Sequence, residues 1–371
     1  MSLPALQALP QGIASLADFE AHARQAMGDE AWAYISGGAA DEITLRANRE
    51  AWDRLRLLPR VLRDLRGGRA SCQLLGRTLP HPILLAPIAY QCLAHPDGEL
   101  ATVHAAAAQG AGMVLSAQAS VRLEQVAAAM GSASERGPLC FQLYWMGDRG
   151  FMRELLARVA AAGFEALVLT VDAPVQGVRD RERRAGQALP PHIRAVNLDG
   201  LPEAPPLPAG AHPLFDGLLQ RAASWAEVDW LRQHSPLPLW LKGLCHPDDA
   251  RQAQALGVSG LVVSNHGGRT LDTVPASADL LPPLRQALGP DFTLLVDGGV
   301  RRGTDVLKAL ALGADAVLLG RPYVYALASA GALGVAHALR LLRDELDIAM
   351  ALSGCRTLAD VGPQLLWPPS P

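Results

Sequence analysis

Eight short apolar runs, separated by Ala- and Leu-rich stretches of helical character, constrain the fold of this chain more than any other feature. Their lengths and their content of Val, Leu and Ile are typical of strands buried on both faces. The runs cover residues 83–86, 113–116, 139–143, 166–171, 238–242, 260–264, 293–297 and 316–320. Each run except the last is followed at short range by a helical stretch, which predicts parallel pairing through right-handed crossovers. Eight such units predict an α/β fold, a (β/α)8 TIM barrel.

The remaining segments fit one elaborated barrel domain over residues 1–371. Residues 1–75 read as a helical lead-in, because Ser15 and Asp18 resemble a capping box and a second helical stretch precedes Gly37. An open, doubly wound sheet is disfavoured, since no G-x-G-x-x-G follows the first strand.

A long loop follows the fourth strand. Residues 172–237 separate it from the fifth strand, and residues 201–213 within this interval are rich in proline. Long insertions after barrel strands often cover the active-site mouth, so we interpret residues 176–235 as a lid. A disordered surface loop is the alternative.

Composition excludes several classes of function. The net charge is -3, and the Arg181, Arg183 and Arg184 cluster is interpreted as a solvated or loop-ordering face, so no nucleic-acid partner is expected. Five scattered cysteines without a C-x-x-C favour reduced thiols, with neither a disulfide framework nor a metal site. Residues 1–25 do not resemble a signal peptide, and no apolar run is long enough for a membrane span. We therefore expect a cytoplasmic protein without a membrane partner.

Polar side chains gather at the ends of all eight strands. In a barrel these ends form one rim, which carries catalytic groups. Gly298 and Gly299 follow strand seven, and Gly320 and Arg321 follow strand eight, where barrels often bind phosphate. A phosphorylated cofactor or substrate is therefore expected at that part of the rim.

His266 lies in a glycine-rich turn after strand six. A histidine at such a rim is suited to proton abstraction, because its pKa lies near neutrality. Arg179 and Arg269 are candidates to hold one carboxylate between them. A satisfied structural histidine is the alternative for His266, and a simple salt-bridge partner is the alternative for Lys242.

The rim residues as an ordered set resemble the FMN-dependent 2-hydroxy-acid oxidases and dehydrogenases, which include glycolate oxidase, lactate oxidase, mandelate dehydrogenase and flavocytochrome b2. The resemblance extends from about Tyr34 to about Arg356. Its motifs lie at residues 34–38, 86–89, 141–144, 170–172, 242–243, 264–272, 297–304 and 352–356.

The resemblance implies FMN as cofactor and a role for each matching residue. His266 matches the base, Asp172 its carboxylate partner, and Lys242 the lysine that stabilises the reduced flavin. Residues that match substrate-binding positions are Tyr34, Tyr144, Arg179, His266 and Arg269. Residues that match flavin, ribityl and phosphate contacts are Pro87, Ala89, Ser116, Gln142, Thr170, Lys242, Ser264, Asp297, Gly299, Arg301, Gly320 and Arg321.

Four positions depart from the pattern of glycolate oxidase. Ile88 replaces a threonine, Gln118 replaces a tryptophan that narrows the site, and Gln176 stands where an aliphatic residue is usual. Together with Tyr90, which resembles the hydroxymandelate oxidase branch, these changes favour a bulky substrate. We therefore expect Tyr90 and Gln118 to contact the side chain of a mandelate-like (S)-2-hydroxy acid.

The resemblance leaves several alternatives open. A soluble oxidase that uses O2 is favoured over a dehydrogenase that uses a quinone or cytochrome, because residues 201–213 carry no basic amphipathic helix. A non-redox flavin barrel, such as type 2 isopentenyl diphosphate isomerase, would not need His266 with two carboxylate-binding arginines. A binding protein without catalysis is disfavoured by the complete rim. The family resemblance also implies a homotetramer.

Overall fold

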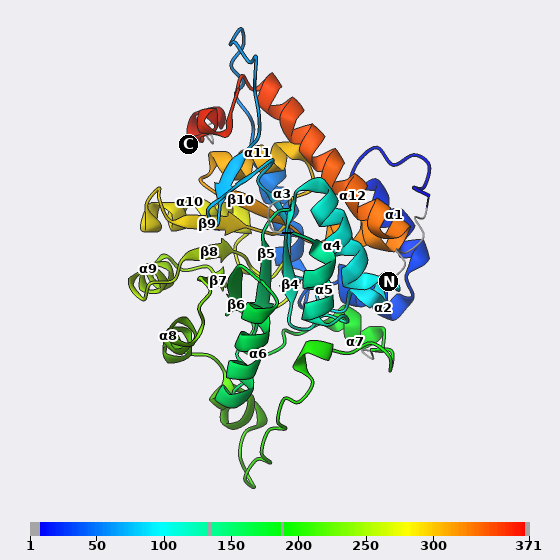
Figure 1. Ribbon diagram of the computed structural model, residues 1–371, viewed down its shortest axis with the longest axis vertical. Helices are drawn as coiled ribbons and strands as arrows, with labels where there is room; N and C mark the ends of the chain where they lie inside the picture. The colour runs from blue at the N-terminus through cyan, green and yellow to red at the C-terminus, as the bar shows by residue number, and fades with distance from the viewer. Residues whose placement is uncertain (1–7, 133–135, 187–188, 368–371) are drawn as a thin grey trace.

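The predicted barrel is confirmed by the computed structural model, which describes residues 8–132, 136–186 and 189–367. Eight parallel strands close in the order β10-β3-β4-β5-β6-β7-β8-β9. Figure 1 shows the strands at the centre of the molecule with helices around them. The barrel strands are β3 (Ile83–Leu85), β4 (Gly112–Ser116), β5 (Leu139–Leu143), β6 (Ala166–Thr170), β7 (Leu239–Leu244), β8 (Gly260–Val263), β9 (Thr293–Val296) and β10 (Ala316–Leu319). Each coincides with one predicted run to within two residues, which follows from their uniform burial.

Successive side chains of each strand point alternately into the barrel and toward the helices, so the core consists of two clusters. Side chains that point inward include Val114, Val168 and Trp240, which form one buried cluster at the barrel centre. Trp240 fits there because its register partner on β8 is Gly260, where a Cβ atom would lie 2.9 Å from the indole. The barrel interior is therefore a packed core and not a pore.

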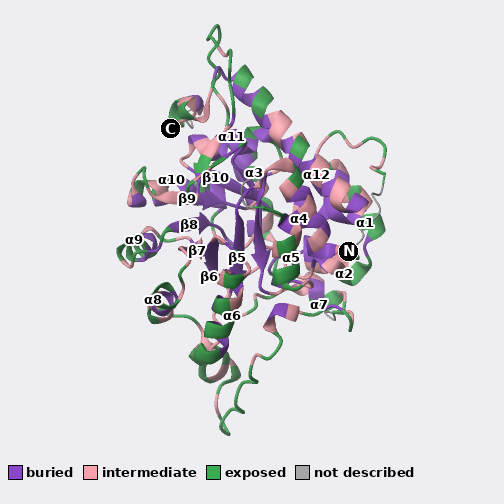
Figure 2. Ribbon diagram, in the orientation of Figure 1, coloured by how far each residue is buried: buried purple, intermediate pink, exposed green. Residues whose placement is uncertain are grey.

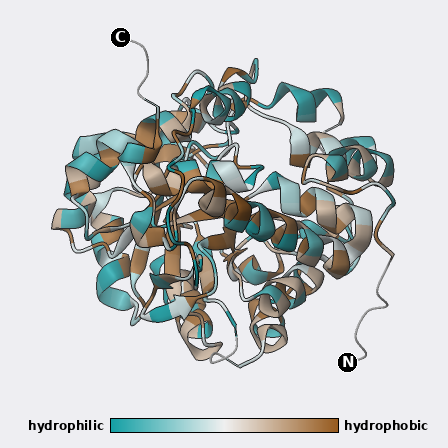
Figure 3. Cartoon of the chain, turned by 90° about the horizontal axis from the view of Figure 1, so that it is seen from above, coloured by the Kyte–Doolittle hydropathy of each residue, from teal (hydrophilic) through white to brown (hydrophobic). Residues whose placement is uncertain are grey.

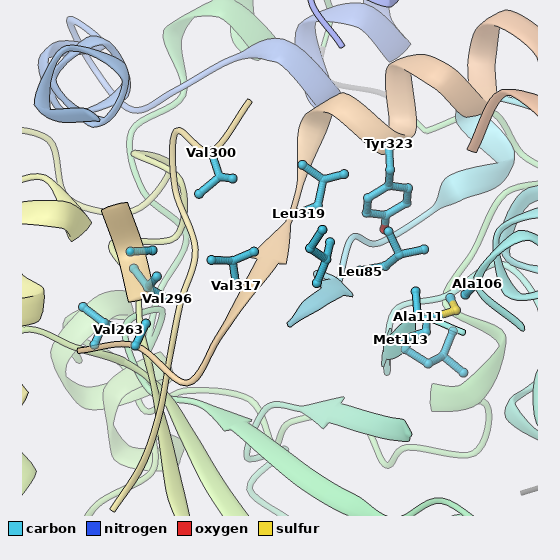
Figure 4. Close-up of a cluster of buried hydrophobic side chains, with 14 of the residues drawn as sticks. Leu85, Ala106, Ala111, Met113, Val263, Val296, Val300, Val317, Leu319 and Tyr323 are labelled. Atoms are coloured by element: carbon cyan, nitrogen blue, oxygen red, sulfur yellow. The ribbon is translucent and has the colours of Figure 1, made fainter. Parts of the chain in front are cut away.

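Outward-facing side chains form the second and larger cluster, between the strands and the surrounding helices. Figure 4 shows part of it, with Leu85, Val263 and Val317 among the labelled side chains. Buried residues concentrate on the strands in Figure 2, and Figure 3 shows hydrophilic residues mainly on the outer helices. The helices after β3 to β9 are α4 (Gly98–Gln109), α5 (Leu123–Met130), α6 (Arg149–Ala161), α7 (Asp180–Arg184), α8 (Trp225–His234), α9 (Pro247–Ala255), α10 (Ser277–Leu288) and α11 (Gly303–Ala311).

A long helix also follows the last strand, where the sequence reading placed none. Helix α12 (Arg321–Leu352) starts directly after β10 and packs against α4, α11 and α1 (Asp18–Ala26). Its Ala-rich sequence has no simple apolar stripe, because it is buried along much of its length and breaks its helical geometry at Ala330 and Gly331. It is long and apolar enough for a membrane span, but 61% of its most apolar window is buried inside the chain. That burial is typical of a core helix.

The lead-in contains the two predicted helices and two elements that were not anticipated. The predicted helices are α1 and α2 (Asp29–Ser36), and a third helix, α3 (Ile43–Arg54), follows. The expectation of a helical lead-in as far as residue 75 needs correction, because β1 (Cys72–Leu74) and β2 (Arg77–Leu79) form an antiparallel hairpin. Leu74 and Leu79 of this hairpin join the inner barrel cluster and close the amino-terminal end of the barrel.

The insertion after β6 contains α7, a π-helical turn (Pro213–Leu218) and α8. Residues 201–213 are almost entirely exposed, and Figure 1 shows this green stretch extending away from the barrel. Residues 187–188 of the predicted lid, and residues 1–7 and 368–371 of the predicted domain, lie outside the described residues.

Candidate active site

A cavity of about 520 Å³ opens at the carboxyl-terminal ends of the barrel strands, within the usual size range of small-molecule sites. Almost all the predicted site residues line it. They are Tyr34, Pro87, Ala89, Tyr90, Ser116, Gln118, Gln142, Tyr144, Thr170, Arg179, Lys242, His266, Arg269, Asp297, Gly299, Arg301, Gly320 and Arg321. The two predicted residues outside the lining are Asp172 and Ser264, which contact lining residues from behind.

The turn after β8 presents His266 to this cavity. His266 has the left-handed φ of 57°, and Gly267 and Gly268 continue that conformation. A non-glycine residue seldom adopts it, so the surrounding contacts must hold it there. The amide of His266 donates to the Ser264 hydroxyl over 3.0 Å, and the amide of Gly268 donates to the Asn265 carboxamide oxygen over 3.1 Å.

The imidazole of His266 is arranged as a base. Its Nδ1 lies 2.8 Å from Oδ1 of Asp172, and because a carboxylate accepts, Nδ1 carries the proton and Nε2 is free to accept another. Burial lowers the pKa of His266, and the positive charges of Lys242 and Arg269 lower it further, although Asp172 opposes the shift. The ring is therefore neutral near neutral pH.

A glycine makes room for the carboxylate behind the histidine. Gly243 has a φ of +105°, and a Cβ atom there would lie 2.4 Å from Cγ of Asp172. Burial raises the pKa of the Asp172 carboxyl, but its interactions with His266 and Lys242 outweigh burial and hold that pKa below its usual value. Its second oxygen, Oδ2, is buried without a hydrogen-bond partner among the described residues.

Lys242 extends from β7 into the floor of the cavity. Its ammonium donates to the Ser264 hydroxyl over 2.8 Å and lies 3.1 Å from Oδ2 of Asp297. Burial alone would lower the pKa of Lys242, but Asp297 and Asp172 raise it above its ordinary value, so the side chain stays charged. A fixed positive charge at this depth is suited to stabilising an anion in the cavity.

Arg179 and Arg269 lie together, but a third residue that the sequence reading missed lies between them. Glu182 of α7 accepts from Nη1 of Arg179 over 3.3 Å and from Nη2 of Arg269 over 3.1 Å. Glu182 is 5% exposed and lines the cavity. Glu182 lies three residues after Arg179, the N-cap of α7, so the two side chains can pair, but this spacing does not indicate that the pair faces a cavity.

Aromatic side chains form one wall of the cavity. The Tyr34 and Tyr90 rings meet edge to face with centroids 5.9 Å apart, and the Arg269 guanidinium lies 5.0 Å from the centre of the Tyr34 ring. Burial raises the pKa of Tyr34 and of Tyr144 above their ordinary values. Both phenols therefore keep the proton with which they would donate to a substrate oxygen.

The loops after β9 and β10 fit the phosphate and ribityl groups of FMN, which the resemblance implies. Oδ1 of Asp297 is buried without a partner among the described residues, as expected of an acceptor for a ligand hydroxyl. A Cβ atom on Gly320 would meet nothing within 4 Å, so the backbone there faces open space. Arg301 is nearby, although its Nη1 lies 2.7 Å from Glu20 of α1.

Arg321 contributes less directly than expected. Its Nε, Nη1 and Nη2 donate to the carbonyl groups of Ile35, Gly267 and Gly37 over 3.1, 3.0 and 2.8 Å. Burial lowers the pKa of Arg321 to about 10, so it remains charged near neutral pH. It therefore holds the rim turn against α2 while it adds positive charge to the cavity.

Comparison with known proteins identifies the relatives of this chain. Residues 23–368 match the family described as FMN-dependent dehydrogenase. The chain is 49% identical over 362 residues to an L-lactate oxidase of Alicycliphilus denitrificans, a match that covers 97% of this chain and 98% of that protein. It is 43% identical to glycolate oxidase 1 of Zea mays, with 94% of each protein covered.

Solved structures agree with this result. A crystal structure of mandelate oxidase with (S)-2-phenylpropionate superimposes with a TM-score of 0.85 at 41% identity. The match covers 95% of this chain and 98% of that one. The fold and the sequence thus match the same group of enzymes along almost their entire length.

Proposed function

The chain belongs to the FMN-dependent dehydrogenase family, and from that premise we propose that it oxidises a bulky, aromatic (S)-2-hydroxy acid to the 2-oxo acid while reducing O2 to H2O2. Its cofactor is FMN and its substrates are 2-hydroxy acids, as in the oxidases to which it is similar. The observation that carries the proposal is the cavity, in which a neutral histidine, two arginines and two tyrosines converge.

His266 accepts a proton from the substrate at Nε2, and Asp172 stabilises the imidazolium that results. Arg179 and Arg269 hold the substrate carboxylate, while Tyr34 and Tyr144 donate hydrogen bonds to substrate oxygen atoms. FMN, when bound, accepts the two electrons removed from the hydroxy acid. Lys242, fixed by Ser264 and Asp297, supplies the positive charge that favours the reduced cofactor.

The side-chain pocket supports a bulky substrate. Tyr90 and Gln118 both line the cavity, and the amide of Tyr90 donates to the Gln118 carbonyl over 3.1 Å, so the two residues form one wall. Gln118 is smaller than the tryptophan of glycolate oxidase, and Tyr90 offers an aromatic face and a hydroxyl. An undersized substrate would leave part of this space unfilled.

A small aliphatic substrate is the second candidate. The 49% identity to an L-lactate oxidase favours it, because that relative acts on lactate. In addition, the rings of Tyr34 and Tyr90 both line the cavity, with centroids 5.9 Å apart, and occupy part of its wall.

The test compares kcat/KM for mandelate, 4-hydroxymandelate, lactate and glycolate, with peroxide measured in air. Mandelate-type acids are expected to rank first, and Gln118→Trp is expected to shift the ranking toward the small acids, since one methylene is worth ~1–3 kcal/mol of discrimination. If glycolate or lactate ranks first, or Gln118→Trp leaves the ranking unchanged, the aromatic pocket is refuted. A bleached flavin without peroxide would instead indicate a dehydrogenase.

We further propose a cytoplasmic homotetramer. Val61, Leu62, Ile348, Leu352 and Trp367 are large apolar residues with more than half of their surface exposed, so they are available for packing against another subunit. Five scattered cysteines without a C-x-x-C support a reducing compartment. A monomer by light scattering at micromolar concentration would refute the assembly.

A further inference from the structure

The arginine pair of the proposed substrate site contains a carboxylate that belongs to the protein. We propose that Glu182 is a positioning residue that fixes Arg179 and Arg269 and reduces their joint charge, so that the site selects monocarboxylates over dicarboxylates. This inference rests on the proposed function, because it assumes that the two arginines receive the substrate carboxylate.

The contacts of Glu182 define its first role. Oε1 receives Nη1 of Arg179 over 3.3 Å and Nη2 of Arg269 over 3.1 Å, and Oε2 lies 3.4 Å from Nη1 of Arg179. Two guanidinium groups repel each other, and a carboxylate between them removes that repulsion. Glu182 therefore keeps the two side chains together before any ligand arrives.

The arginines remain unequal after this pairing. Arg269 is also held by the backbone, since its Nη1 donates to the carbonyl groups of Tyr34 and Gly37. By contrast, Nε of Arg179 is buried and has no partner among the described residues. An unsatisfied buried donor in a ligand cavity indicates a ligand oxygen as its partner, so Nε of Arg179 is the donor that remains available to the substrate carboxylate.

Charge supplies the second role of Glu182. Two guanidinium groups with one carboxylate carry one net positive charge, which a single substrate carboxylate neutralises. A second carboxylate on the ligand would add a negative charge near Glu182 in a site that is largely shielded from water. The unfavourable interaction is strong there, because the effective dielectric constant is far below that of water.

The chain contains a matched control at the opposite end of the barrel. Glu165 precedes β6 and lies between two arginines in the same way, 2.7 Å from Nη1 of Arg136 and 2.9 Å from Nη2 of Arg77. None of these three residues lines the cavity. Glu165→Gln therefore removes the same chemical group from the same kind of pair, without reaching the proposed site.

The experiment measures dissociation constants of two unreactive probes, propionate and malonate, from the flavin absorption spectrum of the FMN-loaded protein. Glu182→Gln keeps an acceptor oxygen but removes the charge, so malonate is expected to tighten relative to propionate by about tenfold or more. Glu182→Asp keeps the charge but shortens the reach, so it should retain the original ratio while both probes weaken. Glu165→Gln should change neither constant.

Three results separate the possible failures. If Glu182→Gln leaves the malonate-to-propionate ratio within twofold of the unaltered protein while FMN stays bound, charge selection is overturned. If Glu182→Asp binds propionate as tightly as the unaltered protein, positioning is overturned. If the unaltered protein responds to neither probe, the proposed carboxylate site itself fails, and this inference fails with it.

Discussion

The two ends of the barrel use similar residues in opposite ways. At the amino-terminal end, Glu165 lies between two arginines, and Arg285 pairs with Asp315 and donates to backbone carbonyls. At the carboxyl-terminal end, Asp172, Arg179 and Asp297 each have one buried side-chain atom that finds no hydrogen-bond partner in the part of the chain that the structure describes.

Leaving such an atom unpaired costs about 1–3 kcal/mol, so the difference is informative. One end is closed by the hairpin β1–β2, and the charged groups of Glu165 and Arg285 there are paired within the protein, which stabilises the fold; Nδ1 of His81 is buried at that end without a hydrogen-bond partner among the described residues. The other end keeps unsatisfied groups around a cavity, which a ligand can complete. We therefore expect substitutions at the amino-terminal end to change stability and substitutions at the carboxyl-terminal end to change binding or rate.

The largest expected contrast is between two histidines, one at each end of the barrel. His266→Ala should retain FMN and lose turnover by about 10²–10⁴-fold, the usual contribution of a general base. His81 lies before β3, with Nε2 3.0 Å from the Gln109 carbonyl oxygen. His81→Ala should lower the unfolding free energy by about 1–3 kcal/mol and leave the turnover per bound FMN unchanged. If the substrate bleaches the flavin of His266→Ala at a near-normal rate, His266 is not the base and the contrast between the two histidines fails.

Two arginines give the next contrast. Arg179→Met removes the open donor edge and should raise KM for the hydroxy acid by about 10–100-fold, since a hydrogen bond to a charged group contributes about 1.5–3 kcal/mol. Arg285→Met removes bonds to the carbonyl groups of Gly289, Gly313 and Phe292. It should lower the melting temperature without changing KM. A large rise in KM for Arg285→Met would contradict the comparison.

Two glycines test the phosphate side of the cavity. Gly320→Ala meets no atom of the chain within 4 Å, so the apoprotein should keep its stability while FMN binds about tenfold more weakly. Gly137→Ala places a Cβ atom 2.3 Å from the Ala111 carbonyl carbon at the other end, so it should destabilise the fold and leave FMN affinity unchanged. Flavin fluorescence during titration of the apoprotein measures both. If Gly320→Ala binds FMN as tightly as the unaltered protein, the phosphate of FMN does not lie beside Gly320.

The smallest effect is expected in the pH profile. His266 must be neutral to act as a base, and its pKa lies below 6.5, so kcat/KM should fall only below pH 6.5. Asp172→Asn removes a charge that raises this pKa, so the acid limb should move to still lower pH. An acid limb above pH 6.5 would refute the assignment.

At the amino-terminal end of the barrel, a fall in pH is expected to lower the folding stability and not the rate of turnover. Burial also lowers the pKa of His81, so the unfolded chain binds a proton more readily than the folded chain does. The contribution of His81 is fully present above the unfolded pKa of 6.5 and is lost as the pH falls below it. His81→Ala should therefore reduce the loss of melting temperature between pH 7 and pH 5.

The sequence predicted the barrel well because each buried parallel strand is a continuous apolar run bounded by polar groups. It did not predict the hairpin β1–β2, since each of its strands has only three residues and shows no complete alternation. Helix α12 was missed because a helix buried on several sides lacks the amphipathic pattern that indicates a helix.

The site shows the same limits. Residues at strand ends were predictable because closure of the barrel brings all strand ends to one rim. Glu182 was not, because its neighbours Arg181, Arg183 and Arg184 resemble a solvated charge run. Arg183 and Arg184 are indeed exposed, whereas Arg181 donates to Ser36 and orders the loop against α2. Only the fold turns Glu182 inward.

The contacts of the rim arginines with residues 34–37 have a consequence for biosynthesis. Tyr34, Ile35 and Gly37 leave the ribosome early, yet their carbonyl groups receive Arg269 and Arg321, which are made after most of the chain. The cofactor site therefore cannot assemble on a growing chain until strand β10 has been made. A polypeptide that stops before Arg321 lacks the contacts of that arginine with Ile35 and Gly37, so FMN uptake is expected only after Arg321 has been made.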